Sequence, residues 1–158
     1  MLSLHTVHEE PNHALTVFGP VLICVWCGPL PHNAQRATAV LHQLKRMRSS
    51  SHRDKLLYVY VAGATSTFPD DDARRIVSGY LVHFDASVGI HEGDTLRASI
   101  VRSIVAGMQM MSKTRSKNTV VQTSEEAGRV LFKLAPELSA AQYQRAIDDT
   151  CALALAKR

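Results

Sequence analysis

The sequence predicts an α/β fold, a mixed and mostly parallel sheet with covering helices and an additional C-terminal helix. Short runs of apolar and β-branched residues alternate with longer stretches whose apolar residues recur every three or four positions, as expected for strands followed by helices. Strands that alternate with helices imply right-handed crossover connections and a mostly parallel sheet covered by helices. With 158 residues, 46% of them hydrophobic, the chain is long enough to bury a core without disulfides or metal.

The composition indicates in which cellular compartment the protein is expected. Three cysteines are too few for a disulfide scaffold, and the first residues lack the order of a secretory signal. The apolar runs are far shorter than the roughly 20 residues of a membrane helix. We therefore expect a cytoplasmic protein with no membrane span.

The first predicted elements are two adjacent strands. Residues 1–12 are interpreted as an N-terminal extension. Ala14–Phe18 and Val21–Trp26 are apolar and are separated by the turn signal Gly19-Pro20. They are interpreted either as a β-hairpin or as an edge strand leading into a central one.

A helix is expected next, with Asn33 as its N-cap and a basic, serine-rich loop containing Ser49, Ser50 and Ser51 at its end. Its apolar residues share one face: Ala37, Val40, Leu41, Leu44 and Met47. The continuous apolar run Lys55–Ala62 is typical of a strand covered on both faces.

Asp70, Asp71 and Asp72 predict the start of a second helix, because negative charge is favourable there. The apolar stripe of this helix comprises Ala73, Ile76, Val77, Tyr80, Leu81 and Phe84. A short strand at Val88–His91 precedes a third helix, whose apolar face comprises Leu96, Ile100, Ile104, Met108 and Met111.

The last third of the chain predicts a strand and two helices. Asn118–Gln122 is the strand, Thr123–Glu126 resembles an N-terminal capping segment, and Pro136 ends the helix that follows. A final helix begins at Ser139 with Tyr143, Ile147 and Cys151 as its apolar line. The prediction is thus one domain over 13–135 and a helical extension over 136–158, which either packs back on the domain or contacts a second subunit in a homodimer.

Three short motifs occur in order along these elements: Trp26-Cys27-Gly28-Pro29, Arg97-Ala98-Ser99-Ile100-Val101-Arg102-Ser103-Ile104 and Thr123-Ser124-Glu125-Glu126-Ala127. With this element order, the chain from about Ala14 to Leu134 resembles the STAS, or SpoIIAA-like, domains of bacterial anti-sigma-factor antagonists. The resemblance is to the uncharacterised bacterial STAS-like proteins in particular.

The resemblance implies a non-enzymatic regulatory module that binds a protein partner. Some members of the family are switched by phosphorylation of a Ser or Thr after the third strand, where this chain has Thr65, Ser66 and Thr67. The Asp-Ser-Ser/Thr-Gly pattern of the family is absent there. The loop Thr65–Pro69 and the helix after it are the expected interaction surface.

Two rival functions remain open. Trp26-Cys27-Gly28-Pro29 is similar to a thioredoxin active site in which Leu30 replaces the resolving cysteine. Cys27 is therefore the candidate reactive thiol of a thiol oxidoreductase, although no downstream strand begins with the proline such enzymes carry. A carrier of an apolar small ligand is the other alternative.

No metal site, cofactor or catalytic residue is predicted. Cys24 and Cys27 form a C-x-x-C, but residues three apart in a strand point to opposite faces of the sheet. The eight histidines are scattered and form no ligand set with recognisable spacing.

Basic residues cluster after two predicted helices, and the topology places both clusters at the same end of the sheet. Together they form a candidate patch for an acidic protein, anionic lipid or, less favoured, a nucleic acid. The favoured alternative is that they offset the dipoles of helix C-termini. The eight residues are Lys45, Arg46, Arg48, Arg53, Lys55, Lys113, Arg115 and Lys117.

Overall fold

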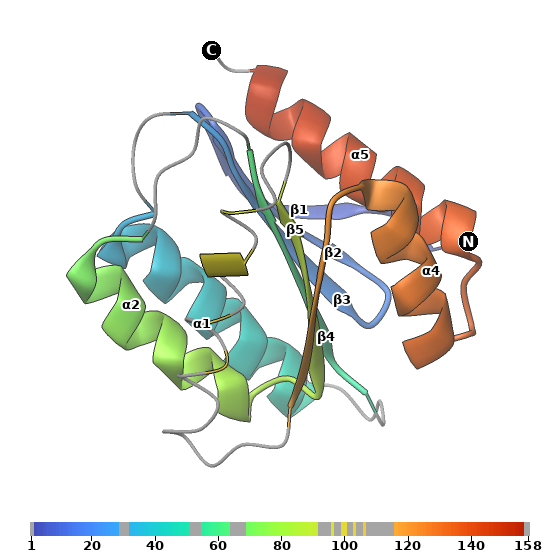
Figure 1. Cartoon of the computed structure of the whole chain (residues 1–158), viewed down its shortest axis with the longest axis horizontal. Coiled ribbons are helices and arrows are strands. Elements are labelled where there is room, and N and C mark those ends of the chain that lie inside the picture. Colours follow the sequence, from blue (N-terminus) through green and yellow to red (C-terminus); the bar gives the residue numbers. More distant parts are fainter. Residues whose placement is uncertain are drawn as a thin grey trace.

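The computed structural model describes residues 2–28, 32–50, 55–63, 69–91 and 116–156, together with positions 96, 99, 100, 103 and 106. In these parts of the chain six strands form one sheet in the order β1-β2-β3-β4-β5-β6 (Figure 1). The first three strands are antiparallel neighbours and the last four are parallel. The strands are β1 (His5–Glu10), β2 (His13–Phe18), β3 (Val21–Trp26), β4 (Leu57–Ala62), β5 (Ala86–His91) and β6 (Lys117–Val121).

Helices cover both faces of the sheet, as Figure 1 shows. On one face lie α1 (Ala34–Ser50) and α2 (Asp71–Ser78), the latter continued by the short 3-10 helix η1 (Gly79–Val82). On the opposite face lie α4 (Ser124–Leu134) and α5 (Ala140–Ala156). The predicted α/β architecture with a mixed, mostly parallel sheet is confirmed.

The central strands are buried on both faces, so alternate residues enter two separate cores. Ile23 and Val25 of β3 pack toward α4 and α5. Leu22 and Cys24 pack toward α1 and α2. Every residue of β3, β4 and β5 is buried. Burial on both faces explains why the sequences of β3 and β4 show no alternation of apolar and polar residues.

The helix starts follow the capping residues of the sequence. The side chain of Asn33 accepts a hydrogen bond from Arg36 N at the start of α1, and that of Asp70 accepts one from Ala73 N in α2. Thr123 and Glu126 form a reciprocal capping box at α4. These polar side chains satisfy backbone donors that the first helical turn leaves without partners.

The structure corrects three details of the sequence interpretation. Residues His5–Glu10 form the edge strand β1, although their sequence carries no strand signal. Ser49 and Ser50 end α1 rather than lying in a loop. Leu96 and Ile100, expected in the core, are 67% and 42% exposed.

Helix α5 packs on the sheet. The Oγ1 atoms of Thr16 in β2 and Thr150 in α5 lie 2.7 Å apart in a buried hydrogen bond. Asn12 N, in the β1–β2 turn, donates to Ala154 O at 2.9 Å. Of the alternatives left open for this helix, packing against the domain is therefore the one observed. None of the described helices has the length and apolar character needed to cross a membrane.

Close packing of α4 on α5 depends on Gly128. A Cβ at this position would lie 2.5 Å from the backbone oxygen of Ala140, which no side-chain rotation can relieve. We expect Gly128→Ala to lower the free energy of unfolding by about 1–3 kcal/mol, measured by urea denaturation. The control is Gly79→Ala, because a Cβ there meets no atom within 4 Å. Equal stabilities of the two variants would contradict this account.

A buried histidine–cysteine cluster as the candidate functional site

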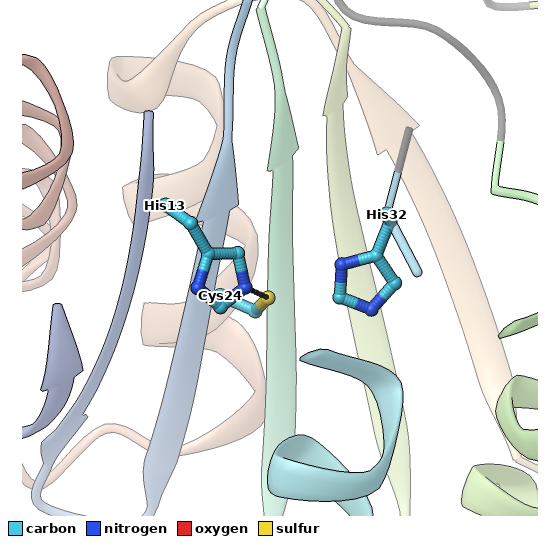
Figure 2. Close-up of side chains that lie close together, drawn as sticks. All are labelled: His13, Cys24 and His32. Atoms are coloured by element: carbon cyan, nitrogen blue, oxygen red, sulfur yellow. Dashed lines mark hydrogen bonds between the residues drawn. The ribbon is translucent and has the colours of Figure 1, made fainter. Parts of the chain in front are cut away.

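Three metal-ligating side chains meet inside the α1/α2 core: His13, Cys24 and His32 (Figure 2). One ligand atom from each lies within 4.8 Å of the others. The closest pair is Cys24 Sγ and His13 Nε2, 3.7 Å apart. The exposed fractions of the three residues are 0%, 0% and 1%, so the cluster is closed to solvent.

Three different elements place these side chains. His13 begins β2 and is the register partner of Trp26, whereas Cys24 is the partner of Leu15, so the histidine and the thiol lie on neighbouring strands. His32 precedes α1, and its carbonyl accepts a hydrogen bond from Asp70 N. Its ring lies beside that of His13, with 5.6 Å between the ring centroids.

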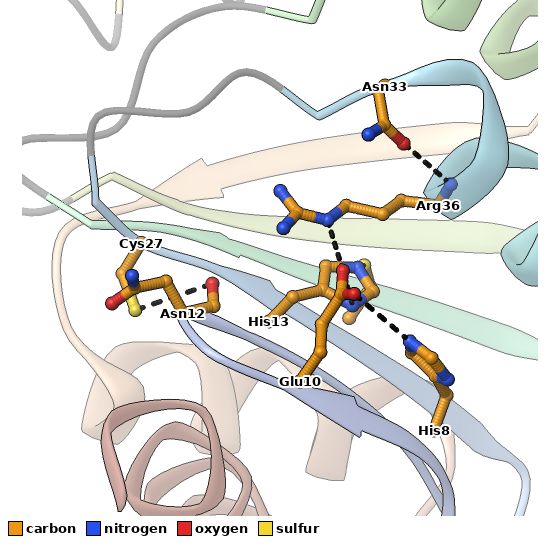
Figure 3. A network of polar contacts seen from close by, with 8 residues as sticks. His8, Glu10, Asn12, His13, Cys27, Asn33 and Arg36 are labelled. Atoms are coloured by element: carbon orange, nitrogen blue, oxygen red, sulfur yellow. Dashed lines mark hydrogen bonds and ion pairs between the residues drawn. The ribbon is translucent and has the colours of Figure 1, made fainter. Parts of the chain in front are cut away.

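A half-exposed polar network adjoins the cluster on the β1 side (Figure 3). Arg36 of α1 donates from Nε to Glu10 Oε1. The other carboxylate oxygen of Glu10 lies 3.8 Å from Nε2 of His8. Glu10 Oε1 also lies 3.9 Å from His13 Nδ1, so the two ring nitrogens of His13 face different groups. A thiol that donates to Nε2 leaves the proton on Nδ1, toward the carboxylate.

The interior location controls the protonation of all three residues. Burial, aided by the charges of His32, Arg36 and His8, lowers the pKa of His13 to about 3. Burial and the Arg36 charge lower the pKa of His32 to about 4, against smaller opposing effects of Asp70 and Glu10. Burial also raises the pKa of Cys24 to about 12. At neutral pH the cluster thus holds two neutral imidazoles and one protonated thiol.

Several buried polar atoms of this core have no hydrogen-bond partner among the described residues. They include both ring nitrogens of His32 and Nδ1 of His13, as well as Nε1 of Trp26, whose ring lies beside that of His32. An unsatisfied buried polar group costs about 1–3 kcal/mol, so such atoms call for a physical explanation. The unpartnered ring nitrogens of His32 lie beside a second imidazole and a thiol, and this combination is a donor set that suits a transition metal.

One separation in the cluster matches the spacing of two ligands on a metal ion. Metal–nitrogen and metal–sulfur distances of about 2.0 and 2.3 Å place two ligands about 3.7 Å apart when they subtend about 120° at the ion. The separation of Cys24 Sγ and His13 Nε2 is 3.7 Å. Glu10 stands where the outer carboxylate of a carboxylate–histidine–metal arrangement would be.

The sequence patterns do not indicate this cluster, and no metal site is predicted from them. His13 precedes the predicted strand Ala14–Phe18, Cys24 lies within the predicted strand Val21–Trp26, and His32 lies in a segment without helical or strand pattern. Their spacing matches no common zinc motif, because the contact arises from strand pairing and from the return of the chain toward α1. A histidine within an otherwise apolar strand was the one signal present.

The side chains of Cys24 and Cys27 point to different sides of the sheet, as the sequence interpretation expects. Cys24 packs toward α1 and α2, while Cys27 contacts the opposite core, so the two sulfurs do not converge. None of the three cysteines, all of which the structure describes, forms a disulfide. Cys27 is half-buried, and its thiol donates to Asn12 O at 3.6 Å. The N-cap of α1 is Asn33, so Cys27 does not occupy the helix start that the thioredoxin comparison assumes.

The expected phosphorylation loop, Thr65, Ser66 and Thr67, lies outside the described residues, and so do Arg53, Lys113 and Arg115 of the candidate basic patch. Lys45, Arg46 and Lys117 are exposed.

The two remaining basic residues contact different layers. Arg48 donates to Asp85 and to the carbonyl of His83, beside α1. Lys55 Nζ donates to the carbonyl of Leu134 at the end of α4, on the opposite face of the sheet. Both therefore have intramolecular partners, and Lys55 serves a helix C-terminus. The patch stays a prediction.

Acid should destabilise the metal-free protein through His13 and His32. Their folded-state pKa values lie below the value of about 6.5 for an unfolded histidine, so the unfolded chain binds more protons between about pH 6.5 and 4. We expect the free energy of unfolding to fall as the pH is lowered through this window, approaching about 1.4 kcal/mol per pH unit for each histidine. Urea denaturation in a chelator measures it.

The matched variants for this pH dependence are His32→Gln and His42→Gln. The first removes one buried titrating group and should flatten the profile, whereas His42 is exposed on α1 and its replacement should not. The charged groups around the cluster, His8, Glu10, Arg36 and Asp70, are retained in both. A wild-type profile that is flat from pH 7 to pH 5 would contradict the assignment.

The structure establishes the α/β class of this chain. The finer resemblance to STAS domains rests on the sequence motifs and stays a prediction. Comparisons of the chain with protein-family models, with characterised proteins and with solved structures found no match.

Proposed function

We propose that the protein is a non-enzymatic binding module that holds one transition-metal ion between His13, Cys24 and His32. The observation that carries this proposal is the convergence of three buried potential ligand atoms within 4.8 Å, together with the two ring nitrogens of His32 that have no hydrogen-bond partner among the described residues. A bound ion would give a buried ring nitrogen of His32 the partner that it lacks in the metal-free protein.

Protonation supports the same proposal. Metal ligands must be deprotonated, and histidines that stay neutral well below pH 7 need not lose a proton before they bind. Only the thiol of Cys24 must ionise. A bound cation lowers the pKa of a coordinating thiol and replaces its proton, so the high pKa of Cys24 in the metal-free protein is not an obstacle.

The test is metal retention by the reduced, metal-stripped protein. We expect about one ion per chain after incubation with Zn(II) or, anaerobically, with Cu(I), followed by desalting and elemental analysis. Cys24→Ser and His32→Gln should each lose at least tenfold in affinity, because each removes one of three ligands.

The matched controls are Cys151→Ser and His42→Gln, which replace the same residue types outside the cluster. Both should retain the metal as the wild type does. Wild-type protein that retains neither ion, or ligand variants that bind as tightly as the controls, would refute the metal-binding function.

A second candidate function is docking of a protein partner, which the resemblance to STAS domains implies. It is favoured by the exposure of Leu96 and Ile100, which lie four positions apart on a helix and so on one face. Exposed apolar residues at this spacing are how an amphipathic helix engages an apolar groove. Val82 of η1 is a further exposed apolar side chain, at 64%.

This candidate predicts a specific loss of binding. Leu96→Glu with Ile100→Glu should reduce recovery of a stoichiometric partner from native-host extract by at least tenfold, since charge at an apolar interface is costly. Ser99→Glu with Ser103→Glu, on exposed residues of the same helical segment, is the control for added charge. Quantitative mass spectrometry of the bait complexes measures both. Equal recovery by the two double variants would rule out this face.

A further inference from the structure

The number of ligands distinguishes between possible ions. In the described part of the chain, the buried group contains two imidazoles and one thiol. A second potential group shares only His13 with it and consists otherwise of His8 and Glu10, on the Nδ1 side of the ring. Glu10 is moreover engaged by Arg36. The buried group therefore supplies three ligands, whereas structural zinc takes four.

Solvent is not a ready source of a fourth ligand. The side chains of His13 and Cys24 are completely buried, and His32 is exposed by 1%. Around them pack the aromatic ring of Trp26, 5.1 Å from that of His32 between centroids, and the apolar residues of the α1/α2 core. A closed, largely apolar site of this kind favours an ion that is stable with three ligands.

The formal charge of the three ligands also favours a monovalent ion. Two neutral imidazoles and one thiolate carry a formal charge of −1, which a monovalent cation neutralises and a divalent cation exceeds. A net charge inside an apolar core is expensive. The neighbouring ion pair of Glu10 and Arg36 adds no net charge, and the Arg36 guanidinium already disfavours positive charge on both histidines.

We infer that the buried cluster is a three-coordinate site for monovalent copper, with His13, Cys24 and His32 as its ligands. The inference rests on the proposed metal-binding function and specifies its ion. A soft thiolate with two imidazoles suits Cu(I). On binding, the Cys24 S–H bond breaks, a Cu–S bond forms and one proton passes to the buffer. Copper stays monovalent throughout.

The first experiment determines coordination in the intact chain. Anaerobic protein is loaded with one equivalent of Cu(I), and X-ray absorption at the copper edge is recorded. We expect two nitrogen ligands and one sulfur ligand, with about one proton released per ion in weakly buffered solution. A four-coordinate spectrum, or more than one sulfur per copper, would overturn the inference.

The second experiment tests the charge argument through Arg36. Replacing it by glutamine removes a positive charge beside the cluster and leaves Glu10 in place. We expect Arg36→Gln to raise the Zn(II) association constant about tenfold and that of Cu(I) clearly less, because a divalent ion gains more from the removed charge. Competition against a chromophoric chelator for each metal measures both constants.

The control for this variant is Arg129→Gln, which breaks an exposed ion pair with Glu125 on α4. It should change neither constant. An Arg36→Gln variant that alters both metals equally would refute the charge argument, and far-ultraviolet circular dichroism verifies that it is folded. The X-ray absorption of the wild type decides the coordination if the variant does not fold.

The outcomes distinguish an error in the identity of the ion from an error in the proposed metal-binding function. Wild-type protein that binds Zn(II) with four ligands and holds it against equimolar Cu(I) would overturn the copper inference and leave the metal-binding function intact. Wild-type protein that binds neither ion overturns both. Cu(I) bound by two nitrogens and one sulfur, lost in Cys24→Ser, supports both.

Discussion

Burial of the central strands on both faces is the constraint on which the rest of this structure depends. All residues of β3, β4 and β5 are buried, and so are all residues of β2 except Val17. A polar group in or beside these strands must therefore find its partner inside the protein. The α4/α5 core meets this requirement at Thr16, whose hydroxyl bonds to that of Thr150. The α1/α2 core leaves imidazole nitrogens of His13 and His32 without hydrogen bonds among the described residues. That difference between the two cores singles out the histidine–cysteine cluster.

Local signals in the sequence predicted most of the described elements because local physics determines them. Asn33, Asp70 and Thr123 cap the helices they were expected to cap. The uninterrupted apolar run over β4 indicated a strand covered on both faces, and it is. Each of these features depends on residues within one turn or one strand, so the printed sequence contains the information.

Features that depend on contacts between distant segments of the chain could not be predicted from local sequence patterns. His5–Glu10 is polar and charged, and it becomes a strand because β2 offers an edge to pair with. His13 and His32 lie far apart in sequence, and the ring of one reaches the other only after the β2–β3 register and the path into α1 are set. Leu96 and Ile100 have the spacing of a buried stripe, yet their exposure depends on what packs nearby. Periodicity records which residues share a face, but not what covers that face.

The candidate site also joins three parts of the fold. His13 belongs to the N-terminal hairpin, Cys24 to a central strand and His32 to the segment that leads into α1. The carbonyl of His32 is in turn bonded to Asp70, the N-cap of α2. An ion held by these three side chains would therefore connect the hairpin with the whole α1/α2 layer. The proposed partner face at Leu96 and Ile100 uses none of these groups, so the two proposals are independent.

Asn12 has a mechanical consequence for the chain. It occupies the β1–β2 turn with a φ of 63°, donates its backbone N–H to Ala154 near the end of α5, and accepts hydrogen bonds from the backbone and the thiol of Cys27. Tension applied to the C-terminal end of α5 would be transmitted through this residue to the hairpin and to the end of β3. His13 follows Asn12 directly in the chain, so a force applied to the C-terminal end of α5 would act one peptide bond away from the buried cluster.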